Sequence, residues 1–577
     1  MGSTSATKGP RRRLKNRKIA SKREVMAGEL KIRCVNDGKS YSVAEGTSLL
    51  EMSNSLSLSS VGRIMAAKVN NVPHGLDCRL FDNADVEFID ISSSYGMRTY
   101  VRTLTFILGK AISNLYKGVS FSVEAPVSNG YYINLRGTEG IRTDAADIRR
   151  EMEAIIARDL PFKRIVCPTD EAIEVFQRHG MDSKVKLLRS IGRLYTEYYT
   201  LDDYPDNYYG ALCPSTGFIF LFGLENYSEG LLLRLPDPNN AGELKPMVRQ
   251  DKMLEIFNEH HRWQDLGCLR TIGEMNELCA KGYANMLINV SEALQEKKIC
   301  HIAENIEARK KVKLVLVAGP SSSGKTTFSK RLSVQLMTCG LRPRALSLDD
   351  YFLPRVQTPL DENGEYDYET IDALNLPLLA EHLQQLFEGK EVELPRYDFQ
   401  AGESVHSGNR MKLEPNDILV VEGIHALNPK LTAAINDKYK YKVYVSALTT
   451  IQLDDHNYIP TTDNRLLRRI VRDAKFRGSS ARDTIARWPS VRAGEEKWIF
   501  PFQENVDTMF NSALLFELAT LRIQALPLLE MVPENTPEYA EAYRLRKFLR
   551  YINPIDMKGL PQDSLLREFL GGSSFHY

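Results

Sequence analysis

The stretch GPSSSGKTTFSK, residues 319–330, decides the fold of the C-terminal half of this chain, and it follows the apolar run LVLVA. Four of its residues, Gly319, Gly324, Lys325 and Thr326, complete the pattern G-x-x-x-x-G-K-[ST]. A strand before this pattern and a helix after it are the setting in which it forms a phosphate-binding loop. LVLVA predicts the strand and the residues after the loop predict the helix. A Gly/Ser-rich loop without a ligand is the structural alternative, and the order strand, loop, helix disfavours it.

The loop has the chemistry needed to hold a nucleoside triphosphate. Its glycines let the backbone curl so that N–H groups point inward, and the start of the following helix adds partial positive charge. We expect Lys325 to reach the β- and γ-phosphates and the Thr326 hydroxyl to bind Mg²⁺. The sequence therefore predicts ATP and Mg²⁺ as cofactors. The residues predicted to hold the nucleotide are Gly319, Pro320, Ser321, Ser322, Ser323, Gly324, Lys325, Thr326 and Thr327.

Strand and helix patterns alternate from residue 311 to 515, which predicts an α/β domain with a mainly parallel sheet. The predicted strands are VKLVLVA, RALSL, DILVV and KVYVS. Ligands of such sheets bind beyond the carboxyl ends of the strands. Asp349 follows RALSL and Glu422 follows DILVV. We expect Asp349 to accept the proton of an attacking hydroxyl, and Glu422 to hold Mg²⁺ with Thr326. A strand-end cap is the alternative for either residue taken singly.

A row of arginines follows in DNRLLRRIVRD, residues 463–473. Arg465, Arg468, Arg469 and Arg472 are spaced i, i+3, i+4 and i+7, so they share one face of a helix. Such a row predicts neutralisation of a transferring phosphoryl group. A solvated basic face paired with nearby acidic residues is the alternative.

Taken together, these motifs resemble the uridine kinase and phosphoribulokinase family of P-loop kinases. The resemblance rests on GPSSSGKTT, SLDDYF, LPRYDF, VVEGIHAL and DNRLLRRIVRD, in this order. It implies an ATP-dependent phosphotransferase with an alcohol group as acceptor, most simply a nucleoside. Asp349 falls on the family's catalytic base and Glu422 on its Mg²⁺-associated glutamate. Arg465 and Arg468 fall on its lid arginines, so the catalytic residues it implies are Asp349, Lys325, Arg465 and Arg468.

The resemblance also implies an acceptor site, with departures from the family pattern. Glu369, in DYETIDALN, falls where an aspartate holds the ribose hydroxyls, and it is one methylene longer. Tyr397, in LPRYDF, falls on a tyrosine that lines the pyrimidine pocket, and Arg465 borders the substrate. Gly402 replaces a histidine that reads the base, which relaxes selection for pyrimidines. A non-nucleoside acceptor, such as a sugar phosphate or a vitamin precursor, therefore stays open.

The front half has a different character. LKIRCV and KSYSVA flank the turn NDGK, which predicts a hairpin within a β-grasp unit at residues 29–92 that resembles the TGS domain. Residues 93–245 resemble the second additional domain of threonyl-tRNA synthetases, on TLTFILGKAI, SVEAPVSNGYYINL and CPSTGFIFLF. The synthetase domain edits with two pairs of metal-type residues. The four matching positions of this chain hold side chains that cannot replace them, so we expect neither editing activity nor zinc. These residues are Arg102, Phe106, Tyr208 and Leu212.

Three further regions complete the predicted organisation: a basic tail at 1–28, a helical connector at 246–310 and a helical extension at 516–577.

The net charge of +1 gives the chain no overall field that would recruit nucleic acid or an anionic membrane. No apolar run reaches 18 residues, so no membrane span is expected. The eight cysteines form no C-x-x-C pair, which fits a reducing compartment. We expect a cytoplasmic homo-oligomer, or an organellar one if the basic tail is a transit peptide.

A function of another class stays open beside the kinase. The chain could be an ATP-binding regulatory or RNA-associated protein that acts through its front half, although RNA binding is not favoured because the TGS-like unit has no basic stripe. Asp349 and the arginine row favour the kinase, because a switch needs no base for an acceptor hydroxyl.

Overall fold

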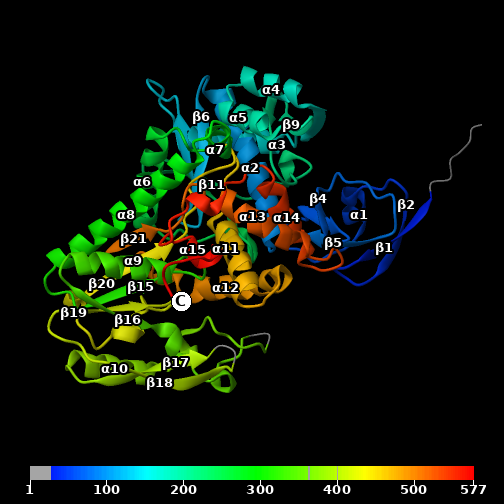
Figure 1. The fold of residues 1–577 in the computed structure, drawn as a ribbon. Coiled ribbons are helices and arrows are strands. Elements are labelled where there is room, and N and C mark those ends of the chain that lie inside the picture. Colours follow the sequence, from blue (N-terminus) through cyan, green and yellow to red (C-terminus); the bar gives the residue numbers. More distant parts are fainter. Residues whose placement is uncertain (1–27, 362–363, 399–400, 577) are drawn as a thin grey trace, which may run out of the picture.

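A computed structural model describes residues 28–361, 364–398 and 401–576 (Figure 1). The predicted basic tail lies outside these residues, apart from Gly28. Within the described part, no helix combines the length and apolar character needed to cross a bilayer. The chain is arranged as a small N-terminal sheet, a second α+β region, a helical connector and a large C-terminal α/β region (Figure 1).

The N-terminal region is a five-stranded sheet with one helix packed on it. Its strands follow the order β2-β1-β5-β3-β4, with β1 and β5 parallel and the other pairs antiparallel. The hairpin predicted around NDGK forms between β1 and β2. The β-grasp and TGS assignments stay predictions. The elements are β1 (Glu29–Cys34), β2 (Ser40–Ala44), α1 (Leu49–Ser55), β3 (Ala66–Val69), β4 (Val72–His74) and β5 (Ala84–Ile89).

The second region packs the long helix α2 against two antiparallel sheets, β11-β12-β7-β6 and β10-β9-β8. Its helices are α2 (Ser94–Leu115), α3 (Ala145–Ala157), α4 (Thr169–Arg178) and α5 (Asp182–Ile191). Its strands are β6 (Ser120–Val127), β7 (Gly130–Arg136), β8 (Lys163–Pro168), β9 (Tyr195–Leu201), β10 (Tyr204–Asp206), β11 (Gly223–Tyr227) and β12 (Gly230–Arg234), and a short hairpin of β13 (Pro236–Asp237) and β14 (Asn240–Leu244) follows.

The four positions that align with metal-type residues lie close together in this second region. The rings of Phe106 and Tyr208 are 5.7 Å apart, and Leu212 is buried in the same core. Arg102 donates to the backbone oxygen of Ala211. Aromatic and aliphatic packing therefore occupies this spot, and the synthetase-like assignment stays a prediction.

The connector is helical, as its sequence predicts. It consists of α6 (Asp251–Leu266), α7 (Ile272–Ala280) and α8 (Ala284–Ala308). Ile299 and Ile302 of α8 belong to the hydrophobic core of the C-terminal region. The connector is therefore packed onto the C-terminal region along the length of α8 (Figure 1).

The C-terminal region is built on a sheet of five parallel strands in the order β16-β19-β15-β20-β21, which confirms the predicted parallel sheet. The strands are β15 (Leu314–Ala318), β16 (Arg342–Ser347), β19 (Asp417–Glu422), β20 (Lys440–Ser446) and β21 (Thr508–Asn511). Successive residues of a strand point to opposite faces. Val315 and Val317 accordingly belong to one core, and Leu314 and Leu316 to the other. The central strand is thus buried on both sides.

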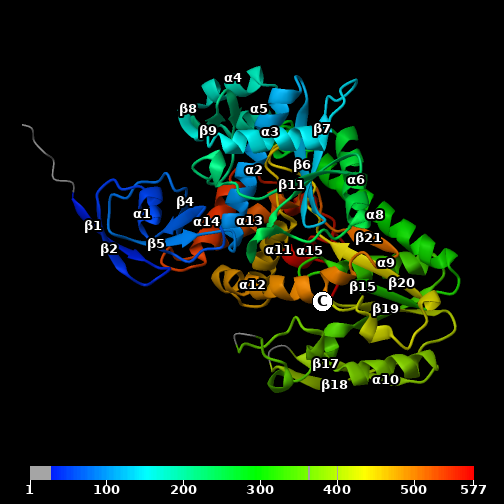
Figure 2. The ribbon, with the colours of Figure 1, turned by 180° about the vertical axis from the view of Figure 1, so that it is seen from behind.

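Helices cover both faces of this sheet. They are α9 (Lys325–Thr338), α10 (Leu376–Phe387), α11 (Thr461–Phe476), α12 (Ala481–Trp498), α13 (Glu517–Glu530), α14 (Tyr539–Leu549) and α15 (Arg567–Leu570). A hairpin of β17 (Val392–Asp398) and β18 (Glu403–Met411) lies with α10 at the β16 edge (Figure 1), and the three elements also lie together in the view from behind (Figure 2). The extension after residue 515 does not stand apart, since Leu545, Leu549 and Phe569 are buried in the same core as Val315.

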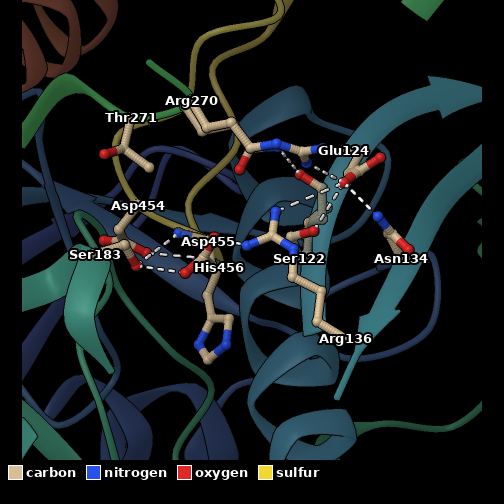
Figure 3. A network of polar contacts seen from close by, with 12 residues as sticks. Ser122, Glu124, Asn134, Arg136, Ser183, Arg270, Thr271, Asp454, Asp455 and His456 are labelled. Atoms are coloured by element: carbon tan, nitrogen blue, oxygen red, sulfur yellow. Dashed lines mark hydrogen bonds and ion pairs between the residues drawn. The ribbon is translucent and has the colours of Figure 1, made fainter. Parts of the chain in front are cut away.

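The segment between β20 and α11 is fixed to the front half by a buried polar network (Figure 3). Lys184 of α5 is only 2% exposed, and its Nζ lies 2.8 Å from Asp206 and 2.9 Å from Asp454. Burial alone would raise the pKa of Asp206, but Lys184 and His456 hold it well below its usual range. Asp455 pairs with Arg136 at 3.0 Å. The chain that leads into α11 therefore has one defined position.

Lys184→Met should destabilise the chain strongly, because it leaves the buried Asp454 carboxylate without its cation and leaves Asp206 with His456 alone. Removing one partner of a buried ion pair costs about 3–5 kcal/mol. Lys186→Met is the matched control, because Lys186 is two residues away on the same helix and pairs with Glu274 while 41% exposed. Its expected cost is below ~1 kcal/mol. Calorimetric melting of both variants tests this, and equal shifts in Tm would contradict the assigned role of Lys184.

Candidate functional site

The predicted phosphate loop connects β15 to α9. Ser322 and Gly324 have φ values of 58° and 82°, in the left-handed region that favours glycine. Gly319 has no room for a side chain, because an added Cβ would lie 1.9 Å from the backbone oxygen of Val445. The loop therefore curls tightly against β20, and the first residue of α9 is Lys325.

Two arginines of α11 lie beneath this loop. Arg465 donates to the backbone oxygen of Ser321 at 2.9 Å, and it pairs with the buried carboxylate of Glu495. Arg468 pairs with Glu517 at 2.6 Å and donates to the backbone oxygen of Ser322 at 3.4 Å. Neither arginine is more than 1% exposed. The guanidinium groups thus bind the carbonyl side of the loop.

Arg465 and Arg468 lie on one face of α11, as their spacing predicts, and that face contacts the loop. The neutralisation of a transferring group by these two arginines stays a prediction. Arg469, the next member of the row, donates to the Ser321 hydroxyl at 3.0 Å. Arg465, Arg468 and Arg469 thus all contact residues of the loop.

The carboxyl edge of the sheet brings four of the predicted residues together. Glu422, at the end of β19, accepts hydrogen bonds from the Thr326 hydroxyl at 3.3 Å and from the Ser347 hydroxyl at 3.4 Å. Burial and then the charge of Asp349 raise the pKa of Glu422, while Lys325 opposes this rise. Asp349 itself is exposed, in the 3-10 turn η2 (Leu348–Tyr351) that follows β16. A cation, a hydroxyl and two carboxylates thus converge in front of the loop.

The oxygen donors at this edge fit Mg²⁺, which prefers hydroxyl, carboxylate, water and phosphate oxygens. Thr326 and Glu422 are the residues that would hold it. Among the described residues, no three Asp, Glu, His or Cys side chains are placed to hold a metal. Phosphate and water would therefore complete the coordination, as is usual for Mg²⁺ bound with a nucleotide.

Lys325 and the loop N–H groups are engaged within the chain. Lys325 Nζ lies 3.4 Å from the backbone oxygen of Pro320. The backbone N–H of Ser321 donates to Glu495 at 3.2 Å, and that of Thr327 donates to Glu568 at 3.3 Å. Carboxylates of the chain therefore accept hydrogen bonds from N–H groups on both sides of Lys325, as anions do at a helix N-terminus.

Glu369, predicted to hold the acceptor, lies beside α12. A Cβ added to Gly494 would come within 2.3 Å of the Glu369 Cβ, so this helix packs directly on it. Its Oε2 is buried without a hydrogen-bond partner. Burial and then the charge of Glu495 raise the pKa of Glu369 to about 7, against the influence of Arg469 and Lys325. Glu369 can therefore carry a proton at neutral pH and offer it to a ligand.

Tyr397, the other predicted acceptor residue, lies in β17 within an aromatic cluster. Its ring is 5.7 Å from that of Phe352, and the residue is 5% exposed. The backbone N–H of Tyr397 donates to Asp350 at 3.3 Å, so Asp350 faces this cluster. Asp349 and Asp350 thus diverge, one toward Glu422 and the other toward β17.

Three residues at the site were not predicted. Arg477, just after α11, is influenced by Asp349, and His425, after β19, lies beside Glu369 with a pKa that burial lowers to about 4. Glu568 reaches Thr327 from the end of the chain. His425 follows Glu422 within VVEGIHAL, so it had a local signal, whereas Arg477 lies one residue past α11 and off the face that carries the predicted arginines. Glu568 had none.

The comparisons with known proteins agree on the C-terminal region. The model of the phosphoribulokinase / uridine kinase family matches residues 314–515. A uridine kinase from Staphylococcus aureus (strain JH9) is 30% identical over 218 residues, which are 37% of this chain and 96% of that protein. The similarity to that relative extends over nearly all of its length, whereas the front half of this chain lies outside it.

Two solved structures are similar to part of this chain. A possible uridine kinase from Bacillus stearothermophilus is 20% identical over 34% of this chain and 88% of its own, with a TM-score of 0.24. A D-glycerate 3-kinase from Cryptococcus neoformans is 18% identical over 36% of this chain and 89% of its own, with a TM-score of 0.27.

Glu369→Gln should stabilise the chain at alkaline pH. The folded chain retains the proton of Glu369 up to about pH 7, whereas the unfolded chain loses it near pH ~4.3. Folding therefore becomes less favourable as pH rises through this window, and the cost is absent below it. The advantage of the variant should grow by roughly 1–3 kcal/mol between pH 5 and pH 8.

Melting curves across this pH range test the expectation, with Glu365→Gln as control. Glu365 is four residues away and exposed, so its substitution should not change the pH dependence. A Glu369→Gln variant whose Tm follows the wild type at every pH would show that this carboxyl is ionised in the folded chain.

Proposed function

The chain belongs to the phosphoribulokinase/uridine kinase family, and from this premise we propose that it transfers the γ-phosphoryl group of ATP to a hydroxyl of a nucleoside. The observation that carries the proposal is the convergence of Asp349, Glu422, Lys325 and Thr326 in front of the loop. A loop that only binds nucleotide needs no exposed carboxylate in that place. Family membership supports a kinase of a small molecule, and the nucleoside is the finer part of the proposal.

Nucleotide binding begins at the loop. Arg465 and Arg468 bind carbonyl oxygens of the loop, and the N–H groups of Ser321 and Thr327 would leave Glu495 and Glu568 and donate to phosphate oxygens. Lys325 would leave the Pro320 oxygen and turn to the β- and γ-phosphates, which are better acceptors for an ammonium group. Bound Mg²⁺, held by Thr326 and Glu422, would neutralise charge on the phosphate oxygens.

The transfer step places the acceptor hydroxyl between Asp349 and the γ-phosphorus. Asp349 takes the proton of the hydroxyl as the new O–P bond forms, and the bond from the γ-phosphorus to the β,γ-bridging oxygen breaks. ADP leaves with that oxygen. Asp349 suits this task because it is exposed and can reach an incoming hydroxyl. The arginines of α11 that contact the loop would supply positive charge near the transferring group.

The acceptor region supports a hydroxyl-rich ligand. Glu369 has a buried oxygen without a partner, and Tyr397 and Phe352 form a buried aromatic cluster that would have to open for a ring to stack on it. A protonated Glu369 can donate one hydrogen bond and accept another, as a pair of ribose hydroxyls requires. Gly402 brings no side chain that would read the edge of a base. We therefore propose a nucleoside acceptor with relaxed preference for the base.

The test is phosphorylation by the purified full-length chain, with radiolabelled ATP and Mg²⁺, of a panel of pyrimidine and purine nucleosides, sugar phosphates and RNA. A labelled nucleoside monophosphate is the expected product. Labelling of another hydroxyl compound alone would remove the nucleoside and keep the kinase. ATP consumption with no labelled acceptor would favour the regulatory alternative, in which the front half responds to nucleotide.

Asp349→Asn should abolish transfer while it leaves ATP binding intact. Loss of the base lowers turnover by ~10²–10⁴-fold, because proton transfer from the acceptor is no longer assisted. The neighbouring variant Asp350→Asn is the control, since Asp350 faces the backbone of Tyr397. We expect it to keep kcat within about tenfold, a change of ~1.4 kcal/mol in the barrier. Steady-state kinetics of both variants test whether Asp349 is the base. A near-normal kcat in Asp349→Asn would exclude this role.

A further inference from the structure

The end of the chain is built into the core beside the phosphate loop. Four residues at and around α15 are fully buried in the same core as Phe328 and Leu332 of α9. They are Leu565, Leu566, Phe569 and Leu570. The guanidinium of Arg468 lies 5.0 Å from the Phe569 ring, and Lys475 of α11 donates to the backbone oxygen of Leu570. This segment lies outside residues 314–515, which the family model matches.

One side chain of this segment, Glu568, binds the first turn of α9, directly after the phosphate loop. The carboxylate of Glu568 accepts a hydrogen bond from the Thr327 hydroxyl at 2.7 Å and from the Thr327 backbone N–H at 3.3 Å. Leu565 packs against the loop from the same side, since a Cβ added to Gly324 would lie 2.3 Å from its Cδ2. Glu568 thus contacts Thr327, within the first turn of α9, and Leu565 contacts Gly324, the residue before this helix.

The N–H that Glu568 occupies is one that a nucleotide needs. Thr327 is the third residue of α9, and the first N–H groups of a helix have no acceptor within the helix. In a loop of this pattern these N–H groups hold the α- and β-phosphates. A carboxylate is favourable there for the same reason as a phosphate, because both are anions at a helix N-terminus. The two anions cannot occupy the same N–H together.

We propose that the C-terminal segment 564–570 is an internal competitor of the nucleotide, with Glu568 in the place of an α-phosphate oxygen. This inference rests on the proposed function, because it assumes that the loop binds ATP. Nucleotide binding then requires Glu568 to leave Thr327, and the apparent affinity for ATP is lowered by the fraction of chains in which Glu568 is bound. Any partner that pulls the C-terminus away would raise the affinity for ATP without touching the loop.

The first test compares ATP binding by three full-length proteins in the presence of Mg²⁺, by titration calorimetry. Glu568→Gln should bind ATP about 5–10-fold more tightly than the wild type, which is ~1–1.4 kcal/mol. Asp563→Asn is the control, because it removes the same charge from an exposed position five residues earlier. Its Kd should stay within about twofold of the wild type, as expected for a screened surface charge.

The outcomes separate this inference from the function on which it rests. If the wild type binds ATP and Glu568→Gln binds it equally or more weakly, the competitor is overturned and the nucleotide site stands. If none of the three proteins binds ATP, the proposed function fails and the inference falls with it.

A second test needs no variant. Hydrogen exchange of the wild-type chain should become faster in peptides from residues 560–576 when MgATP is added, because the segment is released from the loop. Unchanged or slower exchange there, with ATP demonstrably bound, would overturn the proposal.

Discussion

Two buried ion pairs, Arg465 with Glu495 and Arg468 with Glu517, fix the loop on which the rest of the site depends. Both arginines also donate to carbonyl oxygens of the loop, and Glu495 accepts from the Ser321 N–H, so these pairs hold the loop through its backbone. An ion pair at this depth is costly to break, by about 3–5 kcal/mol when one partner is lost. The shape of the loop is therefore set before any ligand arrives.

Contacts far apart in the sequence stabilise these pairs. The segment that leads into α11 is fixed by Lys184, Arg136 and Ser183 of the front half, and α11 in turn carries both arginines. The C-terminal segment also contacts α11, because the Phe569 ring packs against the Arg468 guanidinium. The front half and the C-terminus thus act on the loop through one helix. This gives the front half a structural part in the site, whatever else it binds.

Much of the C-terminal fold and part of the site could be predicted from the sequence. Whether a residue's place could be predicted depends on whether a local pattern or long-range packing determines it. The loop has a local pattern, and parallel strands place Asp349 and Glu422 at one edge because they end there. The partners of Arg465 and Arg468 could not be predicted, because a helical period identifies a face and not what it packs against. Strand β21 is only four residues long, without an apolar run, and was missed. Glu568 and Thr327 are 241 residues apart in the sequence, so no local sequence pattern predicts their contact.

The most direct measurement of the central claim is a crystal structure of the full-length chain with Mg²⁺ and a non-hydrolysable ATP analogue. We expect the β- and γ-phosphates to lie on the N–H groups of the loop and Lys325 Nζ to have turned from Pro320 to these phosphates. The Asp349 carboxylate should face the γ-phosphate, with room for an alcohol between them. A nucleotide bound elsewhere, or Asp349 directed away from the γ-phosphate, would contradict it.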